Sequence, residues 1–276
     1  MEQIRYNVSR PQRLLLFVCV TLVCFLVGAV MVYFIGSTTT PRVRIGTVVQ
    51  DVICFAVPAI ATAVLVTRRP ADLLLIRRPQ MAVMAFMLAT VIFAVPAMNA
   101  LVEWNASLPM PEAWRAGTEM QQEAVRLLFG GSGPGSLVAA LLIVGLMAPL
   151  TEELRCRGCL QRIRGGMINR HAAVWIAATV FSLAHFDMSG FVPRLLLGAC
   201  FGYGMLWSGS LWTAVACHAL NNCMAVTAMW LEEGGNAAGE QIQSFGAGSV
   251  SLIVASSIIC AALLRRAWTS RDKAVA

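Results

Sequence analysis

The chain of 276 residues is 58% hydrophobic and only 13% charged, and its mean hydropathy is +0.71. A soluble domain usually carries about a quarter charged residues, so this composition excludes an ordinary soluble protein and indicates an integral membrane protein. The net charge of +7 reflects an excess of basic residues, which membrane proteins place in cytoplasmic loops, and it gives no support to nucleic-acid binding.

Eight apolar segments follow one another along the chain, and a helix that crosses a bilayer needs about 20 such residues. The four longer segments are residues 14–35, 47–67, 81–102 and 211–231, and the four shorter ones are residues 137–150, 172–186, 193–207 and 250–264. The first is too long for a signal-peptide core, so we interpret it as a retained anchor. The sequence therefore predicts an all-α polytopic membrane helix bundle of about eight transmembrane helices, with residues 1–276 forming one integral membrane domain.

The distribution of basic residues predicts the orientation of this bundle. If all eight segments cross, sixteen Arg and Lys residues lie on the side of the N-terminus and five lie on the other side. Cytoplasmic loops carry the excess of Arg and Lys, so we expect both the N- and C-termini to be cytoplasmic. Omitting one short segment would reverse every later loop, and the charge asymmetry therefore supports counting the short segments.

Two further features contribute less to the functional interpretation. One lies between the third and fourth segments, and the other follows the fourth. The stretch GTEMQQEAVRLLF begins with a capping box from Thr118 to Gln121, which predicts a short helix outside the membrane. Cys156 and Cys159 form a CxxC pair, but a structural zinc site usually needs two such pairs or added histidines. We therefore expect no metal or redox role for this pair.

The fourth segment raises the question of where two adjacent glutamates lie. Residues 137–150 form only about 21 Å of helix, which is short of a hydrocarbon core about 30 Å thick. The helix crosses only if it continues through Glu152 and Glu153, and counting back from Arg164 places Glu152 about 18 Å inside the cytoplasmic surface. An ionisable group at that depth is a candidate functional residue.

The spacing around these glutamates separates their roles. Glu153 and Arg157 are four residues apart, so they share a helix face and are expected to pair. Glu152 lies on a different face and has no local partner. The remaining arginines near this depth require a partner or a water-filled cavity of their own.

Two of the three histidines reach a similar depth. His185 lies about 22 Å beyond Arg170, and His218 lies about 13 Å beyond Gly209. Asn222 follows His218 by four residues and therefore shares its helix face. These residues predict a single polar site assembled from three spans.

Such a set supports two kinds of hydrolysis. In one, Glu152 and His185 hold a water that Glu152 deprotonates as general base, while His218 and Asn222 stabilise the oxyanion. In the other, Glu152, His185 and His218 bind a zinc ion that activates the water. The residue spacing favours neither the metal-free nor the zinc-dependent route.

Three motifs now carry a resemblance. EELRCR (152–157) matches the pattern EExxxR, FSLAH (181–185) matches FxxxH, and HALNN (218–222) matches HxxxN. Their order on successive apolar segments resembles the CPBP superfamily, which contains the CAAX-processing prenyl endopeptidases and the bacteriocin-processing and immunity proteins. Residues 137–231 would be the catalytic core.

The resemblance implies an intramembrane endopeptidase that hydrolyses a peptide bond of a membrane-associated protein or peptide. It implies that Glu152 activates water with help from His185, that His218 and Asn222 form the oxyanion site, and that Glu153, Arg157 and Phe181 support them. Family members are described both as metalloproteases and as glutamate-dependent proteases, so the resemblance leaves the cofactor open. It implies membrane lipid and a peptide substrate as partners, and a multi-pass location in the bacterial inner membrane.

Non-catalytic functions stay open beside this hypothesis. An immunity or scaffold protein would share the fold and act by binding, and a proton or ion carrier would use Glu152 and the histidines as a relay. Asp51 and Asn99, in the second and third apolar segments, would extend such a relay, although hydrogen bonding between helices is the simpler interpretation.

Overall fold

The computed structural model describes residues 9–165 and 167–271, and every regular element in these ranges is a helix. The first elements are α1 (Arg10–Ile35), α2 (Thr40–Gln50), η1 (Asp51–Ala56), α3 (Val57–Val66), α4 (Pro70–Leu73), α5 (Met81–Phe93), α6 (Val95–Ala106) and α7 (Glu112–Phe129), where η denotes a π-helical stretch. The others are α8 (Pro134–Ala140), η2 (Leu141–Met147), α9 (Ala148–Glu153), η3 (Leu154–Gln161), α10 (Arg162–Gly165), α11 (Arg170–Leu183), α12 (Phe191–Ser208), α13 (Leu211–Glu233), α14 (Ala237–Ser244) and α15 (Val250–Ser270). The all-α fold class is confirmed.

Some, but not all, of the eight predicted spans correspond to helices that are long and apolar enough to cross a membrane. Within the described ranges, five helical stretches are long and apolar enough to cross a membrane: Arg10–Ile35, Thr40–Val66, Pro134–Gln161, Leu211–Glu233 and Val250–Ser270. A sixth is added if α5 and α6, which meet at 52°, form one bent span. The other two predicted segments correspond to α11 and α12, which are helices but do not meet the same criteria. The count of eight therefore stays a prediction.

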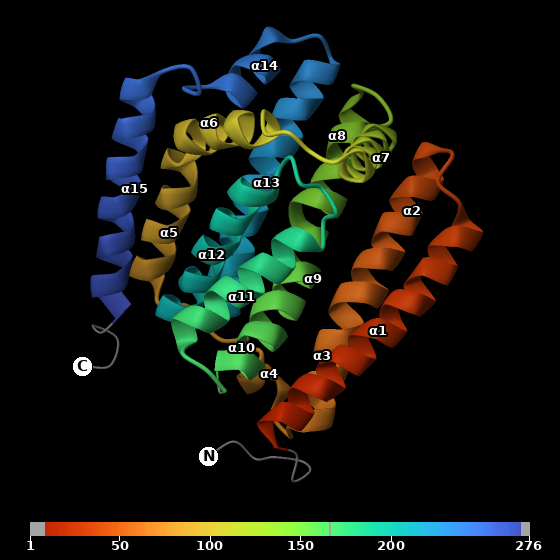
Figure 1. Cartoon of the computed structure of the whole chain (residues 1–276), viewed down its shortest axis with the longest axis vertical. Coiled ribbons are helices and arrows are strands. Elements are labelled where there is room, and N and C mark those ends of the chain that lie inside the picture. The colour runs from red at the N-terminus through yellow and green to blue at the C-terminus, as the bar shows by residue number, and fades with distance from the viewer. Residues whose placement is uncertain (1–8, 166, 272–276) are drawn as a thin grey trace.

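The bundle has a central group of helices between two flanks (Figure 1). α9, α11, α12 and α13 occupy the centre, α1 to α3 form one flank, and α5 and α15 form the other. α1 begins and α15 ends at the same end of the bundle, which agrees with termini on one side of the membrane. The side that this end faces stays a prediction, and Arg5 and Lys273, which contributed to the charge count, lie outside the described residues.

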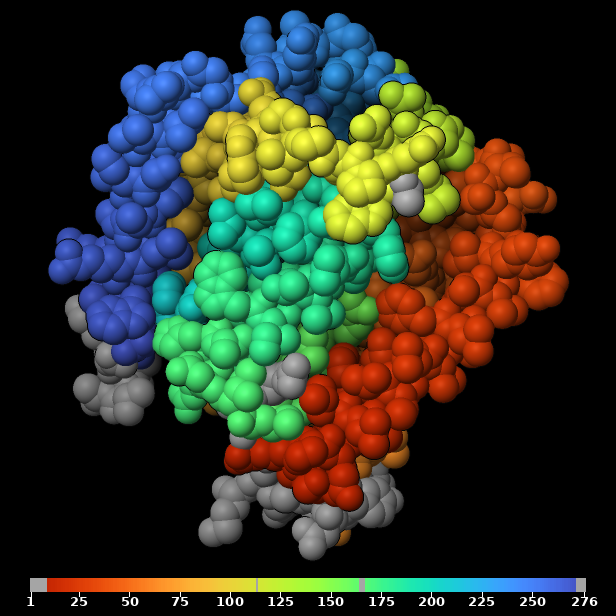
Figure 2. Space-filling model, in the orientation of Figure 1, coloured from red at the N-terminus to blue at the C-terminus, as the bar shows by residue number. Residues whose placement is uncertain are grey.

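α1 and α15 lie at opposite edges of the face shown in Figure 2, and both carry exposed large apolar side chains. Leu22 and Leu26 of α1 are 64% and 68% exposed, and Ile258 of α15 is 64% exposed. Such continuous apolar surface is unfavourable in water and is expected where a helix faces lipid. The outer faces of α1 and α15 therefore mark the lipid-facing sides of the bundle.

Two of the π-helical stretches end just before a proline. η1 precedes Pro58 and η2 precedes Pro149, and each proline is the second residue of the α-helix that follows. Proline has no N–H and its ring crowds the preceding turn, so a helix widens or kinks to accommodate it. The backbone carbonyls freed in this way need donors from elsewhere, since the bilayer offers no water.

The predicted extramembrane helix is present as α7, but its predicted start is wrong. α7 begins six residues before Thr118, at Glu112, after Pro111 as the N-terminal capping residue. The hydroxyl of Thr118 instead donates to the carbonyl of Trp114 and to the carboxylate of Asp187. Proline suits the first positions of a helix, and this signal outweighed the capping-box pattern.

Candidate active site

The helix that carries the two glutamates is continuous from α8 to α10, spanning residues 134–165. The expectation that it continues past Thr151 is therefore confirmed. α9 places Glu152 and Glu153 at its C-terminal end, and the π-helical η3 follows without a break. The side chain of Glu152 is 15% exposed and that of Glu153 is fully buried, so the two neighbours have different surroundings.

Glu153 is held by two cationic or potentially cationic side chains. Its Oε1 atom lies 3.0 Å from Nη1 of Arg157 and 2.9 Å from Nδ1 of His218. Arg157 is also fully buried, and its Nη2 atom donates to the carbonyl of Gly198 at 2.9 Å. The expected Glu153–Arg157 pair is confirmed, and it also positions a ring from α13.

His218 lies between the two glutamates. While its Nδ1 atom contacts Glu153, its Nε2 atom lies 3.9 Å from Oε2 of Glu152. The ring stacks on Phe201, with centroids 4.9 Å apart and planes at 19°, and meets the ring of Phe181 edge-on at 5.5 Å. These contacts on the two nitrogens and on the ring restrict the orientation of the imidazole, with Nε2 directed at Glu152.

His185 reaches the same region from the end of α11. Its Nδ1 atom lies 2.9 Å from the carbonyl oxygen of Phe181. A carbonyl only accepts, so Nδ1 carries the proton in the neutral ring and Nε2 is left as an acceptor. The ring packs against Phe181 at 5.0 Å, as expected, and lies within electrostatic reach of Glu152 and His218.

A network of hydrogen bonds secures the loop after His185. The carboxylate of Asp187 accepts from Ser189, Thr118 and Arg194, and the Arg194 contact is 2.9 Å long. Burial alone would raise the pKa of Asp187, but these donors together hold that pKa below its ordinary value. The network joins α7 and α12 to the loop and thereby restricts the position of His185.

Asn222 lies one helical turn beyond His218, and its side chain is hydrogen-bonded to the backbone of the glutamate helix. Its Nδ2 atom donates to the carbonyl of Val144 at 2.9 Å, and the neighbouring Cys223 thiol contacts the carbonyl of Gly145. Both carbonyls lie in η2, four and five residues before Pro149, which has no N–H to offer them. Asn222 therefore has a structural partner in addition to any role toward a substrate.

We expect Asn222→Leu to destabilise the fold by about 1 kcal/mol, because the carbonyl of Val144 loses its donor within the bundle. Thermal unfolding in detergent micelles measures the change. In a Pro149→Ala background the restored N–H supplies a donor, so the same substitution should cost less. An equal cost in both backgrounds would show that the bond to Val144 is not what Asn222 contributes to stability.

Two further ionisable residues lie near the glutamates. Arg155 is buried, with its guanidinium 4.4 Å from the ring centroid of Phe55 and 5.4 Å from that of Phe25, so this arginine at depth has the partners it was expected to need. Asp51 of η1 is 3% exposed, its Oδ2 atom has no hydrogen-bond partner within the described part of the chain, and η1 packs against α9, which carries Glu152. The sequence signal was an acid within an apolar run, and the interpretation as a hydrogen bond between helices missed its position beside Glu152.

Two glycines of α12 bring that helix against η3. Gly198 accepts from Arg157, and Gly202 accepts from Nε2 of Gln161 at 3.1 Å. A Cβ atom at Gly198 would lie 3.1 Å from Arg157, and one at Gly202 would lie 2.8 Å from Gln161. The sequence analysis missed these residues, although the GxxxG spacing of 198–202 is a known signal for close helix packing in membranes.

The arrangement does not present a metal-binding set. Within the described parts of the chain, no three His, Cys, Asp or Glu side chains are grouped so as to hold a metal ion. In this structure Glu152, His185 and His218 are therefore not grouped as the ligands of a zinc ion. His218 uses Nδ1 for Glu153 and His185 uses Nδ1 for a backbone carbonyl, so each ring keeps Nε2 and these contacts by themselves do not argue against a metal.

One comparison with known proteins finds a family model that matches part of the chain. Residues 134–224, about a third of the chain, match the model of the Rce1-like family, described as type II CAAX prenyl endopeptidase Rce1-like. No curated protein and no solved structure matches the chain. The matched stretch contains all three motifs, and the resemblance to the CPBP superfamily is confirmed.

Proposed function

We propose, from the match of residues 134–224 to the Rce1-like family model, that this chain is an intramembrane endopeptidase that uses water activated by a glutamate. The apolar helices support an integral membrane location, and the family supports a peptide or protein substrate reached from the lipid. The bacterial inner membrane is part of this proposal. A prenylated substrate is not required, because the site residues act on the peptide bond.

Glu152 is the general base in this proposal. It is the less buried of the two glutamates and makes no salt bridge with an arginine among the described residues, so its carboxylate remains a proton acceptor. The 3.9 Å between Glu152 Oε2 and His218 Nε2 is too long for a direct hydrogen bond, and one water oxygen can bond to both atoms. Glu152 takes one proton of that water as its oxygen attacks the peptide carbonyl.

His218 supplies the positive end of the site. Nδ1 of His218 donates to the carboxylate of Glu153, and a ring that also carries a proton on Nε2 donates that N–H to the oxyanion of the tetrahedral intermediate. His185 accepts from the attacking water through its Nε2 atom and orients it. The intermediate collapses when the C–N bond breaks and the proton on Glu152 passes to the leaving amine.

One observation supports this assignment above the others, namely the position of His218 between two glutamates with different roles. An imidazole held by Glu153 and stacked on Phe201 costs no reorganisation when charge develops on the substrate. The remaining N–H of the Asn222 amide is available as a second oxyanion donor, since only one of the two is needed by Val144.

The direct test is cleavage by the purified chain in proteoliposomes, using a library of quenched fluorescent peptides with apolar anchors. We expect turnover that survives extensive treatment with a metal chelator, because Glu152 activates the water without a metal. Loss of activity on chelation and recovery with zinc would contradict the metal-free mechanism. No cleavage of any membrane peptide, with binding retained, would instead favour an immunity or scaffold protein.

An ion carrier is distinguished by a separate readout. Proteoliposomes loaded with a pH-sensitive dye report proton flux, which a relay through Glu152 would produce. We expect no flux above that of empty vesicles, since the polar side chains gather around one enclosed site.

A further inference from the structure

One residue beside the candidate active site combines a strained backbone with an exposed aromatic side chain. Phe186 follows His185 directly, and its backbone is left-handed, with φ of 52°. A bulky residue is rare in this conformation because its Cβ atom crowds the neighbouring carbonyl oxygen. Phe186 is nevertheless 76% exposed, so little of its side chain is packed against the bundle. The packing of its own side chain therefore does not explain the strain at Phe186.

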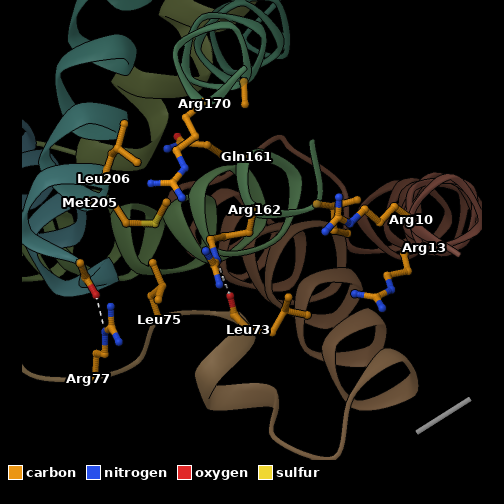
Figure 3. A pocket seen from close by; sticks show the side chains of 13 residues that line it. Arg10, Arg13, Leu73, Leu75, Arg77, Gln161, Arg162, Arg170, Met205 and Leu206 are labelled. Carbon is orange, nitrogen blue, oxygen red and sulfur yellow. Dashed lines mark hydrogen bonds between the residues drawn. The ribbon is translucent and has the colours of Figure 1, made fainter. Parts of the chain in front are cut away.

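A second residue shows what packing alone can enforce. In the described ranges, Leu75 is the other residue besides glycine with a positive φ, of 54°. Its side chain is 8% exposed, belongs to the main hydrophobic core with Met205, and borders the arginine-lined cavity shown in Figure 3. Its carbonyl also accepts from the backbone N–H of Leu211 at 3.0 Å. Burial accounts for the backbone conformation of Leu75, whereas it does not account for that of Phe186.

Hydrogen bonds fix the backbone on both sides of Phe186. Its own N–H donates to the carbonyl of Leu183 at 3.1 Å, at the end of α11. On the other side, the carboxylate of Asp187 is held by the network described above, and the side chain of Asn105 donates to the carbonyl of Met188 at 2.7 Å. The chain therefore cannot relax at Phe186 without breaking hydrogen bonds elsewhere in the loop.

α7 also limits the movement of this part of the loop. A Cβ atom at Gly117 would lie only 2.8 Å from the carbonyl oxygen of Phe186, so the two backbones approach closely where α7 has no side chain. That carbonyl cannot move further toward α7, and Thr118 of α7 donates to the next residue, Asp187, at 2.9 Å. The surrounding structure thus over-determines the conformation, which is the condition under which strain persists in a folded protein.

The choice of phenylalanine at this position then needs an explanation. Glycine adopts a left-handed conformation without strain, so glycine would form the same turn more favourably. Contact with lipid does not require the strain either, because Leu22 and Ile258 are exposed on the regular helices α1 and α15. What the strained turn provides is a rigidly placed aromatic ring in the residue after His185. Strain of this kind is concentrated at active sites and ligand-binding positions.

The ring lies within reach of a peptide bound at the candidate active site. Adjacent Cα atoms are about 3.8 Å apart. The ring of His185 is itself fixed by its contact with the carbonyl oxygen of Phe181 at 2.9 Å. An extended peptide advances by about 3.3 Å per residue, so Phe186 is close to side chains up to about three residues from the bond that is cleaved.

We propose that Phe186 is a specificity-determining residue that contacts an apolar side chain of the peptide substrate, aromatic or long and aliphatic, within about three residues of the scissile bond. This inference rests on the proposed function, since it concerns the same site. Burying two apolar surfaces against each other is favourable, and a ring on a fixed backbone loses little conformational freedom on binding. A substrate with a small side chain at that position gains nothing from the ring.

The first measurement compares cleavage of peptides that differ at one position only. Anchored fluorescent peptides carry Phe, Leu or Ala at each position near the scissile bond in turn, and kcat/KM is measured in proteoliposomes. For Phe186→Ala, we expect kcat/KM to fall roughly tenfold or more when Phe or Leu occupies the contacted position, and to stay unchanged when Ala does. The matched variant Phe34→Ala removes a ring that is 80% exposed on α1, and should leave kcat/KM of every peptide unchanged.

Thermal unfolding in micelles tests whether the ring supports the fold instead. Phe186→Asn relieves the strain, because asparagine tolerates the left-handed conformation, and it removes a side chain that is mostly exposed. We expect a higher melting temperature from this variant and a lower one from Leu75→Asn, which places a polar group in the core. A lower melting temperature for Phe186→Asn would show that the ring packs in the bundle or anchors in lipid, and would overturn the proposal.

A cross-linking experiment separates failure of this inference from failure of the proposed function. The photoreactive p-benzoylphenylalanine replaces Phe186 in the Glu152→Gln chain and couples to whatever lies against the ring. Coupling to the anchored peptides that excess unlabelled peptide prevents would support the inference, even if the wild-type chain cleaves none of them. Coupling to lipid alone would overturn it, as would an equal loss of kcat/KM for all peptides in Phe186→Ala.

Discussion

Replacing Glu152 with glutamine is expected to reduce peptide cleavage by about 100- to 10,000-fold, the range that a general base contributes. Glutamine keeps the size of the side chain and its place near His218, but it accepts no proton from water. Stability should be nearly unchanged, because Glu152 makes no salt bridge with an arginine among the described residues. Initial rates in proteoliposomes and thermal unfolding of the same preparation measure both effects.

A matched control is available on the same protein. Glu232 lies near the C-terminal end of α13, fourteen residues beyond His218 and outside the site, and Glu232→Gln makes the same chemical change. We expect wild-type turnover from this variant. Retained turnover in Glu152→Gln would refute the assignment of the base, whereas loss of activity together with loss of folding would point to a structural role for Glu152.

Replacing the neighbouring Glu153 should instead change the stability of the fold. Glu153→Gln is expected to lower the free energy of unfolding by about 3–5 kcal/mol, because it leaves the fully buried guanidinium of Arg157 without its counter-charge. Activity should fall as well, since His218 loses the carboxylate that holds Nδ1. Unfolding by denaturant in micelles gives the free energy directly.

A double variant separates the charge pair from simple loss of packing. Glu153→Gln combined with Arg157→Met removes both charges and should be less destabilising than Glu153→Gln alone. If instead the two losses add, the pair contributes nothing beyond its separate side chains. Comparison with Glu152→Gln completes the test. Replacing Glu152 should lower the cleavage rate and leave the free energy of unfolding nearly unchanged, whereas replacing Glu153 should lower both.

Much of the helix that carries these glutamates was predictable from the sequence. Its apolar run was too short to cross the membrane unless Glu152 and Glu153 lay inside, and the structure shows one continuous helix through both. The spacing of Glu153 and Arg157 predicted their pair, because residues four apart meet on any α-helix and remain close in the π-helical η3. The start of α7 was predicted wrongly, since a local capping pattern competes with proline and with distant partners such as Asp187.

The sequence by itself determined the class of protein and most of its helical segments, because hydropathy and helical periodicity are properties of one continuous stretch of chain. The depth of the ionisable residues in the membrane stays a prediction. Only the tertiary structure decided which distant groups meet. It placed His218 between Glu152 and Glu153, set Asn222 against a carbonyl left without its N–H donor by Pro149, and brought Asp51 beside Glu152. It also gathered arginines from separate segments around one cavity. Contacts between helices depend on how each helix is rotated about its axis and packed against its neighbours. The residue spacing within one segment does not contain that information.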